Sequence, residues 1–335
     1  MSSFSIGDLA QTFMLQRRGA ELKTDMTRLN EEVATGQVSD IKSVLDGNVS
    51  FLTNLESDLK TLAGYRVATT EATQFADSTQ TVLERVDSSI GGLGTTLLTL
   101  ASSAVNPVLD QFSSDALTEL ETIVSALNTA TAGRSLFAGN ATDQRPLEDV
   151  GVILSGLRGA AAGATTPQDI MVAADLWFSD PAGFEAVAYG GSNEVLAPIR
   201  LGDDEAIRLE LTANDQMFRD ILKSVAVAVI AADPGFGLSV EDQRVLLEES
   251  GQGLFKSRGE LTAERANVGS TQARIDVLAT RNSTEENELH RAKSTLLGVD
   301  PYKAATELEA VQFQLQSLYA ITARMSEMSF VNYIR

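Results

Sequence analysis

Three short segments carry residue types that could do chemistry, and each lacks a part that the chemistry requires. Asp203-Asp204-Glu205 is a carboxylate cluster, but a hydrolase needs two carboxylates held apart in different environments, and adjacent acids in a turn stay solvated. The segment from Gly251 to Ser257 resembles a phosphate-binding loop without the glycine directly before Lys256. Gly235-Phe236-Gly237 lacks the third glycine of a dinucleotide site. We therefore expect no enzyme activity and no cofactor.

Residue counts exclude most metal and thiol chemistry. The 335 residues include no cysteine and a single histidine, His290. Disulfides, thiolate nucleophiles, cysteine-based zinc sites and iron–sulfur clusters are therefore impossible, and so is a site built from several histidines. His290 has no catalytic partner at motif spacing, so we expect it on the surface of a helix.

The charge balance bears on the class of partner. Lys and Arg number 26 against 46 Asp and Glu, a net charge of −20. Such a chain repels phosphate backbones and anionic lipids, so we expect neither nucleic acid nor a membrane as a partner. The longest apolar run, Val225 to Ala232, has eight residues, against the ~20 that span a bilayer. Met1 to Thr12 lacks a basic region followed by an apolar one, so we expect no cleaved secretory signal.

The amino-terminal part shows the seven-residue apolar spacing of paired helices. This stripe ends at Thr35-Gly36, where glycine can take the left-handed conformation of a helix cap. A second stripe begins at Leu52 and changes phase between Leu62 and Phe75, as a stutter in a long coiled coil does. The first stripe contains Leu15, Leu22, Met26, Leu29 and Val33, and the second contains Leu52, Leu55, Leu59, Leu62, Phe75, Val82 and Val86.

The carboxyl-terminal part repeats this spacing. Ser239 and Asp242 indicate a helix start, and Pro301 opens a last helix. A helix from Val240 to about Leu297 would extend ~85 Å at 1.5 Å per residue, longer than a globular core is wide. It must therefore belong to a rod. Its stripe consists of Leu247, Leu254, Leu261, Val268 and Ile275, followed in register by Asn282, a polar residue expected to fix the register, and Leu289.

The middle of the chain has a different pattern. Asp115 is expected to cap a helix, glycine and proline recur after Gly133, and residues 195–201 and 206–211 alternate like strands around a turn at residues 202–204. Trp177 is expected in the core of this part. We predict a mainly α fold, in which long terminal helices pair as a coiled-coil rod with a small inserted α+β or β-rich domain. The predicted segments are an assembly helix (1–48), rod helices (49–139), the inserted domain (140–235), a rod helix (236–297) and a second assembly helix (298–335).

Several motifs resemble the flagellin family and, within it, the branch of hook-associated protein 3. Met325 to Ile334 is similar to the terminal Met-Ser-x-Leu-Ser-Leu-x-Asn-Tyr-Ile pattern of that branch. Gly133 to Gly139 resembles its Gly-Arg-Tyr-Leu-Phe-Ala-Gly segment, and residues 265–269 resemble the family's first carboxyl-terminal helix. The family's Pro-Ser-Asp-Asp-Pro-like element is missing after Gly36, so the resemblance does not define the conformation of residues 36–48.

The resemblance implies a non-enzymatic adaptor at the hook–filament junction of the bacterial flagellum, exported without a cleaved signal. Its implied axial neighbours are hook-associated protein 1 and flagellin, together with further copies of the chain, and an export chaperone engages the carboxyl-terminal stripe before export. The residues themselves agree, because amphipathic ends need a partner for their apolar stripes and non-closing contacts build helical assemblies. The expected assembly positions are Leu22, Met26, Leu29, Leu308, Val311, Leu315, Leu318 and Met325.

Three alternatives stay open. Flagellin itself shares the terminal rods but more often ends in a different tail. A type III secretion needle-tip-like coiled-coil protein would affect host contact and leave swimming intact. An enzyme within residues 140–235 would depend on Asp203, Asp204 and Glu205.

Overall fold

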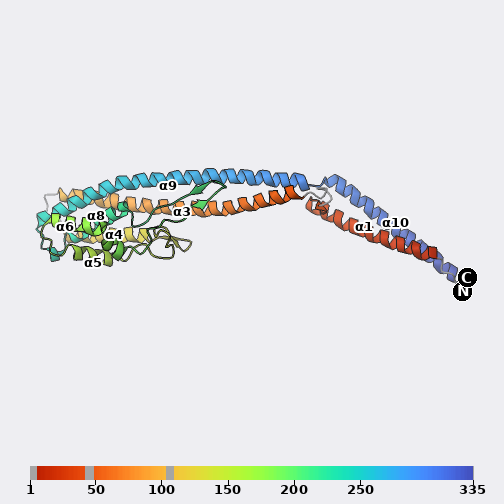
Figure 1. The fold of residues 1–335 in the computed structure, drawn as a ribbon, viewed down its shortest axis with the longest axis horizontal. Coiled ribbons are helices and arrows are strands. Elements are labelled where there is room, and N and C mark those ends of the chain that lie inside the picture. The colour runs from red at the N-terminus through yellow and green to blue at the C-terminus, as the bar shows by residue number, and fades with distance from the viewer. Residues whose placement is uncertain (1–5, 42–48, 103–108, 335) are drawn as a thin grey trace. The chain divides into compact units, whose positions relative to one another are not determined.

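The computed structural model describes residues 6–41, 49–102 and 109–334, and these are mainly helical, as predicted (Figure 1). The carboxyl-terminal helices begin at the predicted Val240 and Pro301. The elements in chain order are α1 (Ile6–Thr35), α3 (Ser50–Ala101), α4 (Leu109–Leu127), β1 (Ala130–Thr131), β2 (Arg134–Ser135), α5 (Val150–Ala160), α6 (Pro167–Ser179), the π-helix η1 (Pro181–Glu185), α7 (Ala186–Ala188), β3 (Ile199–Arg200), β4 (Ala206–Ile207), α8 (Gln216–Ile230), the 3₁₀-helix η2 (Pro234–Phe236), α9 (Val240–Leu297) and α10 (Pro301–Ile334).

The chain forms two compact units, and α3 and α9 contribute residues to both. The terminal unit comprises residues 1–63 and 283–335, and the central unit comprises residues 64–282. This division coincides with none of the predicted segment boundaries. The predicted boundary after residue 48 falls at the edge of a segment outside the described ranges.

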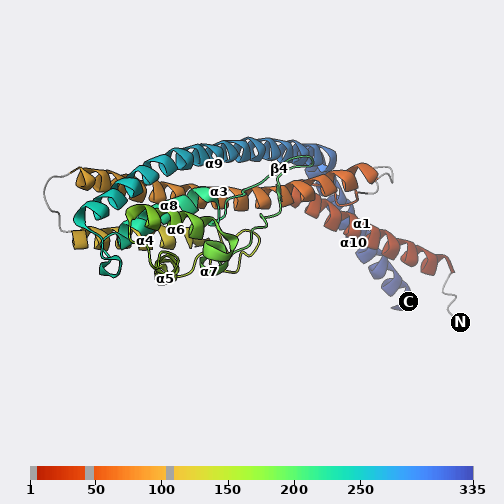
Figure 2. The same ribbon diagram turned by 60° about the vertical axis from the view of Figure 1, so that its left-hand side comes forward.

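Within the central unit, α3 and α9 lie side by side in both views (Figure 1 and Figure 2). The predicted seven-residue stripe of α9 is buried from Leu247 to Ile275, and no residue of this stripe exceeds 3% exposure. Asp87 of α3 accepts from Arg258 at 2.8 Å and forms an ion pair with Arg265 at 3.4 Å. Apolar burial at every second turn therefore holds the two helices together, as the spacing predicts.

The predicted stutter in α3 is wrong. Small residues continue the seven-residue stripe where large apolar residues are missing. Thr69 and Ala76 occupy the two positions after Leu62 and are 5% and 0% exposed. Two large members of the predicted stripe, Leu59 and Phe75, are only half-buried. The unbroken stripe is Leu55, Leu62, Thr69, Ala76, Leu83, Ile90 and Leu97.

The rest of the central unit packs several helices around α8. Eleven of the 15 residues of α8 are buried, and the Phe218 ring lies edge-on to Phe137 at 5.6 Å. The inserted part is more helical than the alternation predicts, since each of its strands has only two residues. Asp115 does not begin α4 as predicted, because this helix begins six residues earlier, at Leu109.

The other capping and turn predictions agree with the structure. Ser239 and Asp242 exchange the two hydrogen bonds of a capping box at the start of α9, with the Asp242 amide donating to Ser239 Oγ at 3.1 Å. Gly36 ends α1 with φ of 68°, a conformation that glycine adopts at little cost. The turn at 202–204 is closed by the Leu201 amide, which donates to the Glu205 carbonyl at 2.9 Å.

Candidate functional site

The terminal unit is built on α1 and α10, which run in opposite directions and lie side by side (Figure 1). Arg18 of α1 donates to Gln314 of α10 at 3.4 Å, and the Lys23 ammonium lies 5.9 Å from the centre of the Tyr319 ring. Gly19 admits the Leu318 side chain, which would lie 3.2 Å from a Cβ at this position. These contacts define one apolar seam between the two helices.

All eight predicted assembly residues lie in or at the border of this seam. Leu22, Leu29 and Leu315 are buried, with exposures of 3%, 2% and 8%. The other five are half-buried: Met26, Leu308, Val311, Leu318 and Met325. The structure thus places these side chains between α1 and α10 of the same chain, and their role between subunits stays a prediction.

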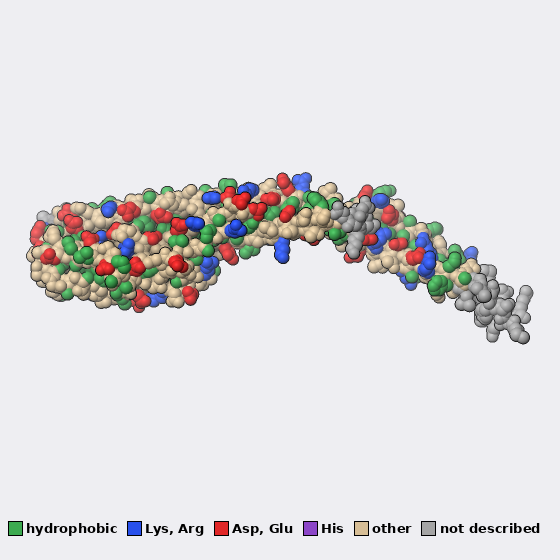
Figure 3. All heavy atoms as spheres, in the orientation of Figure 1, with side chains coloured by type: hydrophobic (Ala, Val, Ile, Leu, Met, Phe, Trp, Pro, Cys, Tyr) green, Lys and Arg blue, Asp and Glu red, His purple; other side chains and the backbone are tan. Residues whose placement is uncertain are grey.

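A second set of apolar side chains in this unit points away from the seam, and sequence reasoning missed most of it. Phe13 and Met14 on α1 are 67% and 65% exposed, and Tyr302 and Phe313 on α10 are 83% and 71% exposed. Phe13 and Phe313 each precede a seam leucine by two residues, which is about 200° around a helix. This off-stripe spacing is the signal that could have found them. Figure 3 shows hydrophobic side chains at the surface along this helix pair.

The seam of α1 ends near Val33, which the sequence predicts to be part of the apolar stripe. Val33 is 39% exposed, whereas the Glu32 side chain beside it is almost wholly buried. Glu32 accepts from Arg28 at 3.0 Å and from the Ser39 amide at 3.2 Å. Glu32 therefore occupies the last buried position of the seam on α1. Its carboxylate also binds the Ser39 amide in the segment that follows this helix.

The segments that follow α1 and α9 are joined by backbone hydrogen bonds. The Val38 amide donates to the Leu297 carbonyl at 2.9 Å, and the Val299 amide donates to the Gly36 carbonyl at 3.0 Å. Because unpaired backbone groups are costly, this pairing stabilises both segments.

The carboxylate cluster at residues 203–205 clamps the β3–β4 hairpin onto α3 and α9. Asp203 accepts from the Tyr65 hydroxyl at 2.9 Å, and this hydrogen bond raises the pKa of Tyr65. Glu205 pairs with Arg274, whose hydrogen bond holds the pKa of Glu205 below its usual range. Asp203 and Glu205 consequently have a structural role in the hairpin, whereas Asp204 is exposed.

Asn282 stabilises the same hairpin. It is 5% exposed, and its amide nitrogen donates to the Leu201 carbonyl at 2.7 Å. The interpretation of Asn282 as a residue that fixes coiled-coil register is thereby corrected, because its hydrogen bond goes to the hairpin.

The remaining candidates from the sequence are the segment from Gly251 to Ser257, His290 and Trp177. The segment from Gly251 to Ser257 lies inside α9, where a Cβ at Gly251 would meet the Leu98 side chain at 2.8 Å. His290 is exposed, with Nε2 4.0 Å from Glu286. Trp177 is half-buried at the edge of the core and not enclosed by it.

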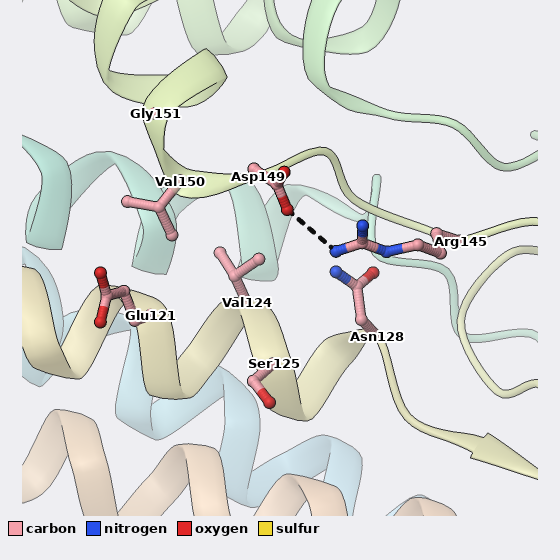
Figure 4. A pocket seen from close by; sticks show the side chains of 8 residues that line it. All are labelled: Glu121, Val124, Ser125, Asn128, Arg145, Asp149, Val150 and Gly151. Carbon is pink, nitrogen blue, oxygen red and sulfur yellow. Dashed lines mark hydrogen bonds and ion pairs between the residues drawn. The ribbon is translucent and has the colours of Figure 1, made fainter.

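A polar pocket of about 580 Å³ lies between α4 and the start of α5 (Figure 4). Arg145 and Asp149 pair across its mouth at 3.1 Å, and both side chains are more than half exposed. Asn128 donates to the Leu147 carbonyl and accepts from the Leu147 amide, which fixes the loop that forms one wall. Three of the pocket's polar side chains, Arg145, Asp149 and Asn128, thus bind one another or the local backbone.

Two further searches of the described residues gave no site. No group of three or more His, Cys, Asp or Glu side chains within them could hold a metal ion. None of the helices in these ranges combines the length and apolar character that a membrane span requires.

Comparisons with known proteins concern the carboxyl-terminal part of the chain and its fold. Residues 256–334 match the family model described as the bacterial flagellin C-terminal helical region. The chain is flagellin-like. The matched residues cover the later part of α9 and nearly all of α10, the helix that carries the seam and the exposed Phe313.

Solved structures support this relationship at the level of the fold. A protein from Vibrio parahaemolyticus described as a flagellar hook-associated protein superposes with a TM-score of 0.51 at 14% identity, over 73% of this chain and 95% of that chain. FlgL from Bacillus cereus superposes with a TM-score of 0.50 at 14% identity, over 72% of this chain and 99% of that chain. No curated protein sequence matches the chain. The fold and the carboxyl-terminal match together support a structural protein of the flagellum.

Proposed function

We propose that this flagellin-like chain is a non-enzymatic adaptor at the hook–filament junction, where it packs head to tail with neighbouring subunits through α1 and α10. The observation that carries the proposal is the apolar surface that this helix pair leaves exposed. Phe13 and Phe313 lie far from the seam and are more than two-thirds exposed. Contiguous apolar side chains on the surface of a helix pair are typical of a protein–protein interface.

The distribution of charge also favours self-association at these helices. α1 and α10 together carry six basic and eight acidic residues, which leaves nearly all of the net charge of −20 in the rest of the chain. Copies can therefore approach through the helix pair with little repulsion, whereas the remainder repels like-charged copies. Apolar faces on both helices allow each copy to contact two others, which is the geometry of a ring or helical assembly.

The eight seam residues are also proposed to contact neighbouring subunits. Met26, Leu308, Val311, Leu318 and Met325 are half-buried within the pair, so each offers part of its surface to a neighbour. Hook-associated protein 1 and flagellin are the proposed axial neighbours. An export chaperone is proposed to bind α10 before assembly. The proposed location is the extracellular flagellum, reached by export without a cleaved signal.

A second candidate is flagellin itself, and the match to its carboxyl-terminal region favours it. The two candidates differ in copy number, because a filament contains far more subunits than a junction does. Quantifying the chain in purified flagella distinguishes them.

Electron microscopy of a strain that lacks the gene tests the proposal. We expect hooks without filaments and flagellin released into the medium, because the adaptor alone is missing. Normal filaments in that strain would refute the adaptor role. Bare hooks with no flagellin in the medium would identify the chain as the filament subunit.

A further inference from the structure

A cleft of about 500 Å³ in the central unit has no part in the proposed assembly. Its walls are the carboxyl end of α5 at Ala160, the outer face of α6 and the bend from Asp180 to Gly183. This volume suits one or two side chains of a binding partner.

Trp177 is the fixed aromatic wall of the cleft and the only tryptophan of the chain. Its ring lies edge-on to Phe178 at 4.8 Å and to Phe184 at 5.9 Å. Gly156 leaves room for it, since a Cβ there would lie 2.4 Å from the indole. Among the residues that the structure describes, no acceptor takes a hydrogen bond from the indole N–H. The packing thus presents a rigid indole with a free donor.

The floor of the cleft is apolar and open. Val172 and Leu176 are one turn apart on α6 and are 57% and 64% exposed, with Ala173 between them. Exposed apolar side chains beside a fixed tryptophan are typical of the centre of a protein interface.

Two carboxylates at the rim keep one oxygen each for a ligand. Asp169 uses Oδ2 to accept from Thr166, and Asp180 uses Oδ1 to accept from the Ala182 amide. Among the described residues, their other oxygens have no partner. The hydrogen bond from Thr166 holds the pKa of Asp169 below its usual range, so this carboxylate is charged at neutral pH.

From these groups we infer that the cleft binds a protein partner through an arginine flanked by apolar residues. The arginine stem would lie on Val172 and Leu176, and its guanidinium would meet the free oxygen of Asp180 beside the Trp177 ring. Asp169, at the other end of α6, would add attraction at longer range. Arginine suits this site because it combines an apolar stem, charge-assisted hydrogen bonds and stacking on an aromatic face. A second copy of this acidic chain is a poorer occupant, because its surface would bring further negative charge to the rim.

The test uses the full chain and two peptides, acetyl-Leu-Arg-Leu-amide and acetyl-Leu-Glu-Leu-amide, with Trp177 fluorescence as the readout. We expect a saturable change with the arginine peptide, with a dissociation constant of about 1 mM, and none with the glutamate peptide. Added salt weakens the response, because exposed charges are screened.

A double variant, Asp169→Asn with Asp180→Asn, tests the rim carboxylates. Each asparagine keeps an amide oxygen that can accept the capping hydrogen bonds, and we expect the affinity for the arginine peptide to fall about tenfold or more. The matched control is Asp143→Asn with Asp204→Asn, which removes two exposed charges elsewhere in the central unit and leaves the affinity unchanged. If the asparagine pair does not fold, Val172→Ser with Leu176→Ser serves instead, since both side chains are exposed, and the same loss is expected.

Three results would overturn the inference. One is the lack of a saturable response to the arginine peptide, and another is an equal response to both peptides. The third is an unchanged affinity in the variant that lacks the rim charges. None of these results bears on assembly through α1 and α10, so the adaptor proposal is tested separately.

Discussion

The central and terminal units bury their apolar residues in different ways. In the central unit, α8 is enclosed on nearly all sides, and Phe137, Phe178, Phe184 and Phe218 are almost fully buried. In the terminal unit, α1 and α10 share one seam and leave aromatic side chains such as Phe13 and Phe313 exposed. A core that closes on itself makes a unit stable alone, whereas an open seam leaves surface for another subunit. The difference supports the proposal that the terminal unit, with its open seam, is the one that assembles.

The largest expected effect comes from opening the closed core. Phe218→Ala removes a fully buried ring that packs on Phe137, and it should lower the free energy of unfolding of the central unit by about 3–5 kcal/mol. The matched change in the seam, Leu315→Ala, should cost the terminal unit about 1–2 kcal/mol, because the space it leaves is open to water. Hydrogen exchange resolved by segment measures both losses, and equal losses would remove the contrast between the units.

A smaller effect is expected at the hairpin clamp. Asn282→Ala deletes the donor to the buried Leu201 carbonyl, and it should destabilise the central unit by about 1–3 kcal/mol. Thermal unfolding measures the loss, with Asn287→Ala, at an exposed position of the same helix, as the control. A loss as small as that of the control would mean that the hairpin does not depend on this hydrogen bond.

A pH effect of about 1 kcal/mol is expected in the central unit. Burial raises the pKa of Tyr189 to about 12, so the folded state keeps its proton where the unfolded chain, with a pKa near 10, loses it. The stabilising difference is complete below pH 10 and is lost as the pH rises toward 12. Urea unfolding across this range should show that loss in the wild type and less of it in Tyr189→Phe. The control Tyr302→Phe, at a side chain that is 83% exposed, should leave the alkaline loss intact. An identical loss in Tyr189→Phe would assign it to other groups.

The long helices could be predicted from the sequence because burial along a rod depends on spacing alone. The stripe from Leu247 to Ile275 and the helix starts at Val240 and Pro301 follow directly from periodicity and capping. The register of α3 could not be read in the same way, since Thr69 and Ala76 are small enough to pack at the interface without being strongly apolar. A pattern search for large apolar residues therefore found a break where none exists.

The candidate site was predicted in part. Periodicity identified the seam between α1 and α10, since seven-residue spacing reports which residues face a partner helix. Periodicity alone does not name the partner helix, but the predicted pairing of the two terminal helices is confirmed by contacts between residues about 300 positions apart. The exposed Phe13 and Met14 were missed because they lie off the stripe, and the link from Asn282 to Leu201 was missed because its acceptor is a distant backbone carbonyl.

The smallest effect on stability is expected at the exposed aromatic residues. Phe13→Ser with Phe313→Ser should change the free energy of unfolding by no more than about 0.5 kcal/mol per site, as surface substitutions do. Chemical denaturation of the isolated chain checks this. A large loss would show that these rings stabilise the subunit itself.

The fraction of hooks that carry filaments, counted by electron microscopy in cells whose only copy carries Phe13→Ser with Phe313→Ser, tests the central claim most directly. The control is Val277→Ser, an equally exposed apolar residue of the central unit. If the exposed faces of α1 and α10 join subunits, the double variant is exported in normal amounts but leaves most hooks bare, and the control resembles the wild type. Filaments at wild-type frequency in the double variant would contradict the account.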